Sequence, residues 1–242
     1  MGYSGSELIE GEAMEASKTR TQVLPGNDGA GGAATLLSAV GIEKAYRRLG
    51  RRRKRAQVLA GAGIELYPGE VVGLVGENGS GKSTFMKVLV GALDADAGTV
   101  TTRGRVGYCP QEPLVYSRLT CDEHIELFGR AYGMPDADVR RSRNELYEGL
   151  NFARYAGVRV DRLSGGTLSK LNLALALLPD PDVLLLDEPY AGFDWDTYLR
   201  FWDLVEARRA RGKSVLVVSH FVVDEHRFTR IVDVRDGRTW SR

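Results

Sequence analysis

The stretch from Gly76 to Thr84 has the composition and spacing of a phosphate-binding loop. It runs Gly-Glu-Asn-Gly-Ser-Gly-Lys-Ser-Thr and fits the pattern G-x-x-x-x-G-K-[ST]. Glycines let backbone N–H groups turn toward a polyphosphate, the lysine reaches its outer phosphates, and the next hydroxyl can ligate Mg²⁺. The sequence therefore predicts a nucleoside triphosphate site. The residues expected to hold the nucleotide are Gly76, Asn78, Gly79, Ser80, Gly81, Lys82, Ser83 and Thr84.

Two adjacent carboxylates follow a second apolar run. Residues 183–186 are four aliphatic residues typical of a buried strand, and Asp187 and Glu188 come directly after them. A carboxylate at a strand end can hold Mg²⁺ through water, and its neighbour can polarise an attacking water. A purely structural role is a weak alternative, because burying an uncompensated carboxylate is costly. We therefore expect Asp187 to hold Mg²⁺ through water and Glu188 to polarise the attacking water.

A second phosphate-binding helix end is predicted at Ser164-Gly165-Gly166. The serine is a favoured N-cap, and the two glycines allow a ligand to approach the backbone closely. One chain rarely needs two such sites for one nucleotide.

Three further residues carry weaker indications. Tyr46 can stack on a base, Gln111 lies between two prolines, and His220 follows a predicted strand, where ligands bind in open α/β sheets. For each of them a structural role remains the alternative.

The elements that must position these residues alternate between strands and helices. Residues 71–75 read as a buried strand before the glycine loop, and residues 85–90 as a helix after it. Thr120 and Glu123 form a capping box, which opens a helix ending near Gly133. A second helix follows without a strand between them, so a small helical subdomain is expected. On the first helix, a stripe of Ile125, Phe128 and Tyr132 is expected to face the core.

Composition limits the function classes. The chain has 33 Lys and Arg against 32 Asp and Glu, so no overall field favours nucleic acid. No apolar run reaches the roughly 18–20 residues of a membrane span. The two cysteines fit no metal-ligand spacing.

A basic run over residues 47–55 could touch anionic headgroups, but a solvated hairpin tip is the favoured interpretation. Residues 1–34 are expected to form a flexible tail.

Taken in order, these motifs resemble the nucleotide-binding subunit of an ATP-binding cassette (ABC) transporter, from about residue 36 to the end of the chain. The resemblance implies an α/β fold: a P-loop NTPase (RecA-like) core with an antiparallel β subdomain and an inserted α-helical subdomain. The ATPase domain would span 35–242 and the helical subdomain about 112–178. The matched features are Tyr46, the glycine loop, Gln111, the signature Leu163–Gly166, the acidic strand end, residues 191–194 (the D-loop) and His220.

The resemblance also implies residue roles. Tyr46 would stack on adenine, and Gln111 would sense the γ-phosphate and Mg²⁺. Glu188 would be the catalytic base, and His220 would hold the γ-phosphate and the attacking water. Lys82 would contribute to catalysis, Ser83, Gln111 and Asp187 would serve the metal, and Ser164, Gly165 and Gly166 would contact ATP bound by a second subunit.

The implied partners are a multi-span membrane permease and a second copy of the chain or a paralogous ATPase subunit. No nucleic-acid partner is expected. The implied location is the cytoplasmic face of the cell membrane, and the closest likeness is to bacterial ABC-2-type exporter subunits. The fifth signature residue is Thr167 where glutamine is usual, so a changed rate of ATP turnover rather than its loss is expected. A soluble ABC ATPase of translation or DNA repair is the alternative.

Overall fold

The structure is a computed structural model that describes residues 20–24, 34–47, 55–219 and 224–242. His220, most of the basic run and most of the predicted tail lie outside these residues. The strands are β1 (Arg20–Leu24), β2 (Leu37–Arg47), β3 (Arg55–Leu66), β4 (Val71–Val75), β5 (Ala97–Arg103), β6 (Val106–Cys109), β7 (Val183–Asp187), β8 (Ser214–Val218), β9 (Arg230–Arg235) and β10 (Arg238–Ser241). The α-helices are α1 (Lys82–Leu89), α2 (Cys121–Ala131), α3 (Asp136–Gly149), α4 (Gly165–Leu177) and α5 (Trp195–Ala210).

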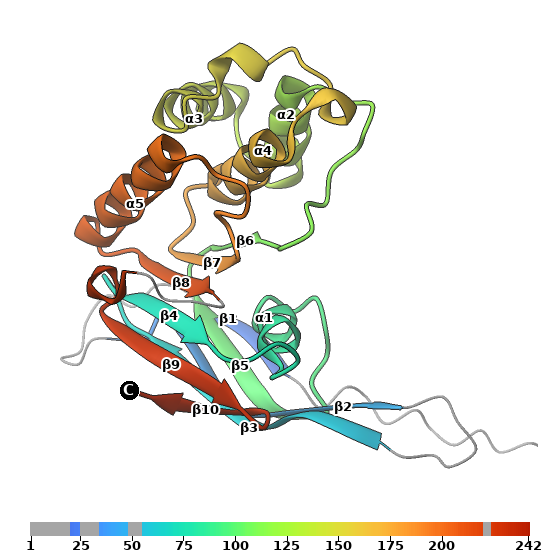
Figure 1. The fold of residues 1–242 in the computed structure, drawn as a ribbon, viewed down its shortest axis with the longest axis vertical. Helices are drawn as coiled ribbons and strands as arrows, with labels where there is room; N and C mark the ends of the chain where they lie inside the picture. Colours follow the sequence, from blue (N-terminus) through green and yellow to red (C-terminus); the bar gives the residue numbers. More distant parts are fainter. Residues whose placement is uncertain (1–19, 25–33, 48–54, 220–223) are drawn as a thin grey trace, which may run out of the picture.

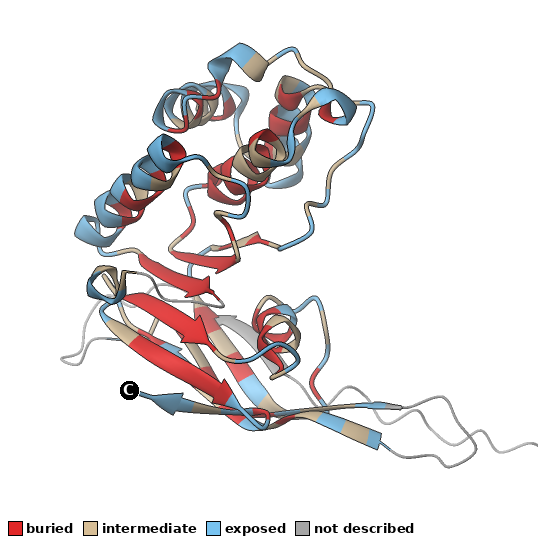
Figure 2. Ribbon diagram, viewed as in Figure 1, coloured by how far each residue is buried: buried red, intermediate tan, exposed pale blue. Residues whose placement is uncertain are grey.

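A six-stranded sheet in the order β10-β9-β4-β8-β7-β6 forms the centre of the fold. All its pairs are parallel except the β9–β10 hairpin. Strands β4, β7 and β8 are buried along their whole length, as aliphatic runs covered on both faces should be (Figure 2).

The two faces of the sheet contact different sets of elements. On β7, Leu184 and Leu186 pack with helices α2–α5, while Val183 and Leu185 pack with α1 and the second sheet. Helices α2–α5 form one layer, and α1 lies on the opposite side of the sheet (Figure 1). The predicted fold class is therefore confirmed: the protein has an α/β core, and α2, α3 and α4 lie between β6 and β7 in the chain without a strand among them.

The second sheet has four strands in the order β1-β5-β2-β3. Pairs β2–β3 and β2–β5 are antiparallel, as expected, but β1 pairs parallel with β5. The structure therefore differs from the predicted tail at residues 20–24, which form an edge strand of a mixed sheet. The cause is non-local: Arg20 to Leu24 pair in register with Thr99 to Arg103, a partner that composition does not reveal.

The helix that follows the capping box begins as predicted but does not bury its whole apolar stripe. Thr120 Oγ1 accepts from the Glu123 N–H at 3.2 Å, and the Glu123 carboxylate accepts from the Thr120 N–H at 2.7 Å. Ile125 is fully buried, whereas Tyr132 is 42% exposed and Phe128 is half-buried. The expected core position is confirmed for Ile125 and in part for Phe128, which packs against the core of the helix layer, and it is wrong for Tyr132. The outer residues line a groove.

Candidate active site

The glycine loop joins β4 to α1 in a backbone conformation that side chains would prevent. Gly76, Gly79 and Gly81 have φ values of 156°, 81° and 108°. A Cβ at Gly76 would lie 2.5 Å from the Val234 carbonyl oxygen, and one at Gly81 would lie 2.8 Å from the Val58 carbonyl oxygen. The loop is therefore held between β3 and β9, where only glycine fits.

Lys82 is held inside this loop. Its Nζ donates to the carbonyl oxygens of Gly76 at 2.7 Å and Glu77 at 3.0 Å. Burial lowers the pKa of Lys82, and the carboxylates of Glu188 and Asp187 oppose that shift. The ammonium group is therefore anchored by backbone oxygens close to the acidic end of β7, a position suited to a negatively charged ligand.

Two helices begin in a way that leaves room for an anion. Of the five α-helices in the described part of the chain, α1 and α4 alone have no acidic residue in the first turn. No side chain caps α1, whose N-cap is Gly81. The first N–H groups of a helix lack intrahelical partners and carry the positive end of the helix dipole. Both helix ends thus fit a phosphate group.

Gln111 and Glu188 come together from two neighbouring strands. Gln111 follows β6, Glu188 follows β7, and the two strands pair in parallel, so their carboxyl ends meet at one edge. Gln111 Nε2 donates to Glu188 Oε2 at 3.3 Å. Glu188 has a φ of 52°, a left-handed conformation that costs a non-glycine residue free energy and often marks functional sites. Its backbone N–H donates to Val218 O at 3.2 Å, which fixes this turn.

The signature end of α4 packs against the D-loop. Ser164 Oγ accepts from the Thr167 N–H at 3.3 Å and lies 2.8 Å from Thr167 Oγ1. A Cβ at Gly166 would lie 2.2 Å from the Gly192 carbonyl oxygen, so glycine is needed there for close packing. Asp194 caps α5 by accepting from the Thr197 N–H at 2.8 Å.

The two helix N-termini that fit a phosphate group belong to opposite faces of the six-stranded sheet. Helix α1 packs with the second sheet, and α4 packs within the helix layer (Figure 1). Tyr46 lies at the end of β2, opposite Ala56, and is 43% exposed. Gln111, Glu188 and Lys82 lie near the carboxyl ends of β6, β7 and β4. Ser164 and Gly166 belong to the helix layer.

The residues present fit ATP with Mg²⁺. The glycine loop is a cradle that any Cβ at Gly76 or Gly81 would disturb, and Ser80 Oγ is buried there without a hydrogen-bond partner among the described residues. The described residues hold no group of three His, Cys, Asp or Glu that could bind a metal by itself. One hydroxyl, Ser83, and one carboxylate, Asp187, suit Mg²⁺, which takes few protein ligands alongside phosphate oxygens and water.

Two residues of this region were missed in the sequence. Ser169 Oγ lies 3.1 Å from Gly165 O and 3.0 Å from Ala191 O, so it links the signature to the D-loop. Asn172 Nδ2 donates to Pro110 O at 2.7 Å, directly before Gln111. Neither stands in a motif. Asn172 is a buried polar residue in the otherwise aliphatic stretch 171–177 of α4, which could have drawn attention to it, whereas no such feature marks the half-buried Ser169.

A glycine cradle at a helix N-terminus, an anchored lysine and a glutamine–glutamate pair at parallel strand ends define a P-loop ATPase. Residues 59–191 match the family model described as ABC transporter. The chain belongs to the ABC transporter family. It is an ATP-binding, ATP-hydrolysing subunit of such a transporter, as the resemblance of the motifs had implied.

Relatives and solved structures agree with this assignment. The chain is 34% identical over 214 residues to "Nod factor export ATP-binding protein I" of Paraburkholderia xenovorans, which covers 83% of this chain and 69% of the relative. The protein of the same name from Burkholderia lata is 34% identical over 206 residues, 80% and 68% of the two chains. An ATP-binding subunit of an ABC transporter superposes with a TM-score of 0.76 at 25% identity, covering 86% of this chain and 90% of that one.

Proposed function

We propose that the chain hydrolyses ATP between two subunits to drive export of a solute through a separate membrane-spanning protein. The observation that carries the proposal is the convergence of Gln111 and Glu188 beside the glycine loop that holds Lys82. A base, a sensor and a phosphate cradle at one edge are the parts that nucleotide hydrolysis needs.

Each residue of the site has a proposed role. Lys82 exchanges its carbonyl partners for phosphate oxygens of ATP. Glu188 orients and polarises the attacking water, and Gln111 holds the Glu188 carboxylate toward it. Ser83 and Asp187 hold Mg²⁺, with Gln111 beside them, and the bound ion would neutralise charge on the phosphates. Tyr46 stacks on adenine. His220, outside the described residues, is proposed to contact the γ-phosphate.

The signature serves an ATP bound by a second subunit. Because α1 and α4 begin on opposite faces of one sheet, a chain presents a phosphate cradle on one surface and an uncovered phosphate-binding helix end on another. Head-to-tail pairing of two chains brings Ser164 and Gly166 of each chain to the cradle of the other. A dimeric bacterial ABC cassette has the same fold, with a TM-score of 0.76 at 24% identity.

Export is the proposed direction of transport. It is supported by the relatives named above, whose printed names describe export of Nod factor. In the part of the chain that the structure describes, no helix combines the length and hydropathy that crossing a bilayer requires. The export named for these relatives also supports the proposed location, the cytoplasmic face of the membrane, which the chain would reach through a membrane-spanning partner.

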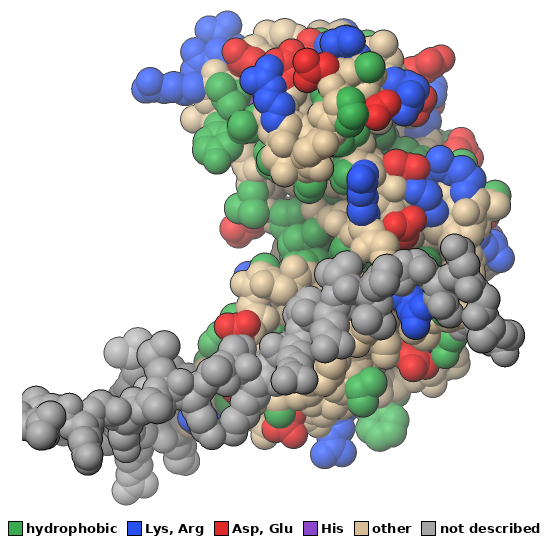
Figure 3. Space-filling view, turned by 180° about the vertical axis from the view of Figure 1, so that it is seen from behind, with side chains coloured by type: hydrophobic (Ala, Val, Ile, Leu, Met, Phe, Trp, Pro, Cys, Tyr) green, Lys and Arg blue, Asp and Glu red, His purple; other side chains and the backbone are tan. Residues whose placement is uncertain are grey.

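The partner is proposed to dock in an apolar groove between the helix layer and β6, an edge strand of the six-stranded sheet. The cavity measures about 330 Å³. Its lining is mostly apolar: Val90, Ala92, Val106, Tyr108, Pro110, Leu114, Phe128, Tyr132, Asn172, Leu175 and Ala176. Viewed from behind, hydrophobic side chains gather in the hollow between the two parts of the molecule (Figure 3). Leu114 at the rim is 75% exposed and continues the apolar lining of the groove, and a contiguous exposed apolar surface of this kind marks protein–protein contact sites.

Replacing Leu114 with aspartate is expected to release the chain from the membrane. The substitution places a charge in a desolvated contact, so we expect the membrane-bound fraction of the full chain to fall about tenfold. Charge reversal at the exposed Arg118 should act in the same direction. The measurement is fractionation of native cells that express tagged variants, with ATP affinity measured on the purified proteins.

Val40→Asp provides the matched control. Val40 is 62% exposed on β2, outside the groove, so this variant should stay with the membrane. A Leu114→Asp chain that remains fully membrane-bound would remove the groove from the docking role.

A further inference from the structure

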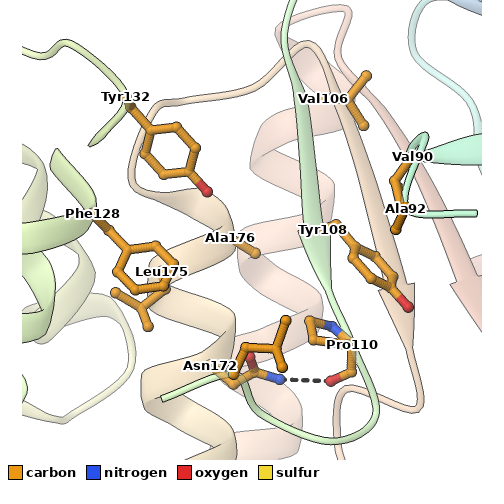
Figure 4. A pocket seen from close by; sticks show the side chains of 11 residues that line it. Val90, Ala92, Val106, Tyr108, Pro110, Phe128, Tyr132, Asn172, Leu175 and Ala176 are labelled. Carbon is orange, nitrogen blue, oxygen red and sulfur yellow. Dashed lines mark hydrogen bonds between the residues drawn. The ribbon is translucent and has the colours of Figure 1, made fainter. Parts of the chain in front are cut away.

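One polar side chain of the groove, Asn172, contacts the backbone directly before Gln111. It lies on α4, is 7% exposed, and sits among the apolar residues at the floor of the groove. Figure 4 shows its carboxamide pointing across to Pro110 on the opposite wall. Asn172 Nδ2 donates to Pro110 O at 2.7 Å and lies 3.2 Å from Cys109 Sγ. Burial raises the pKa of the Cys109 thiol to about 12, so the sulfur stays protonated and neutral.

The Pro110 carbonyl has a particular importance because of its place in the backbone. It shares one planar peptide unit with the N–H of Gln111, so fixing the oxygen fixes the orientation of that whole unit. The proline ring fixes its own φ, and Cys109 before it is buried at the end of β6. Gln111 therefore starts from a rigid backbone, and its side chain meets Glu188 at 3.3 Å.

The same helix carries the signature at its N-terminus. Asn172 stands just over two turns, or ~12 Å, along α4 from Ser164. The C-terminal half of α4 is packed tightly on β6, since a Cβ at Gly107 would lie 2.3 Å from the Ala176 carbonyl oxygen. Helix α4 thus contacts the Gln111 segment through one hydrogen bond and β6 through close backbone packing.

We propose that Asn172 is a positioning residue for ATP hydrolysis, whose hydrogen bond to Pro110 sets the orientation of Gln111 toward Glu188 and joins it to the signature helix. The inference rests on the role proposed above for Gln111. Since the hydrogen bond lies in the groove floor, a partner segment seated there contacts the residue that orients Gln111.

The test begins with Asn172→Ala, which removes the donor and leaves space for water to solvate Pro110 O. The turnover number of the full chain is expected to fall about tenfold, while its affinity for ATP stays within about twofold. Asn172→Leu, whose side chain branches at the same carbon but has no donor, should give the same pattern. Leu173→Met, a volume-conserving change at the neighbouring buried position of α4 that does not line the groove, is the control expected to keep turnover near wild type. Thermal unfolding of each variant establishes that it is folded.

A double-mutant cycle with Gln111→Ala separates positioning from general damage. If Asn172 acts through Gln111, Asn172→Ala should slow the Gln111→Ala enzyme by less than about twofold, because there is no longer a side chain to orient. A second tenfold loss would overturn the inference, as would normal turnover of a folded Asn172→Ala chain. Normal turnover of Gln111→Ala itself would instead overturn the proposed role of Gln111, so the two failures are distinguishable.

Discussion

Replacing Glu188 with glutamine is expected to slow ATP turnover by roughly 10²–10⁴-fold, the range for loss of a general base. Glutamine has the same shape and the same backbone cost at a φ of 52°, so the fold of this turn should not change. Its amide oxygen can still accept from Gln111 Nε2, but the side chain no longer attracts a proton from water. ATP affinity should stay within about threefold of wild type, because the glycine loop and Lys82 are untouched. Steady-state phosphate release and equilibrium nucleotide binding measure the two quantities.

The control for this variant is Glu206→Gln, the same change of charge at an exposed position of α5. It should leave turnover unchanged. Hydrolysis by Glu188→Gln at a rate near wild type would show that another group activates the water.

Two inactive variants are expected to restore activity when mixed, if the site is shared between subunits. Lys82→Ala damages the cradle, and Ser164→Asp places a carboxylate where the signature faces the partner's γ-phosphate. Each variant alone should lose at least about tenfold in turnover, since like charges and a missing cation both disfavour the bound state. In a mixed dimer one site carries both lesions and the other carries neither. Equal mixing should return about a quarter of the wild-type rate, because half of the dimers are mixed and each has one intact site.

The structure determines which signature variant is suitable. Aspartate is a good N-cap and can replace Ser164 as the acceptor for the Thr167 N–H, so α4 should begin normally. Ser164→Asn caps equally well without charge, and it should retain more activity than Ser164→Asp. Gly166→Asp is less suitable, because its Cβ would meet Gly192 O at 2.2 Å and disturb the D-loop of its own chain. Active Ser164→Asp on its own would show that the signature does not face phosphate.

The parts of the fold that follow from local sequence were predictable. Aliphatic runs ending in glycine or carboxylates predicted β4 and β7, and the Thr120–Glu123 pair predicted the start of α2. Parallel pairing of β6 with β7 then brings Gln111 to Glu188; the resemblance implied a role for each residue, whereas this pairing was not predicted.

The parts that depend on distant contacts were not predictable. Strand β1 is defined by its pairing with β5, and the apolar stripe of α2 does not reveal that Tyr132 is 42% exposed while Ile125 is buried. The contacts of Ser169 with the D-loop and of Asn172 with Pro110 join segments that no spacing rule relates. Sequence patterns record which way a residue faces along its own element, and they omit what the neighbouring element supplies.

The claim that two chains complete one another's sites is tested most directly by the mass of the Glu188→Gln chain in solution with and without ATP. Slow hydrolysis should let bound nucleotide hold the two subunits together, so light scattering is expected to give one chain without nucleotide and two chains with ATP and Mg²⁺. Adding Ser164→Asp to the same chain should prevent the increase in mass. A Glu188→Gln chain that binds ATP and Mg²⁺ while its mass stays that of one chain would contradict the shared site.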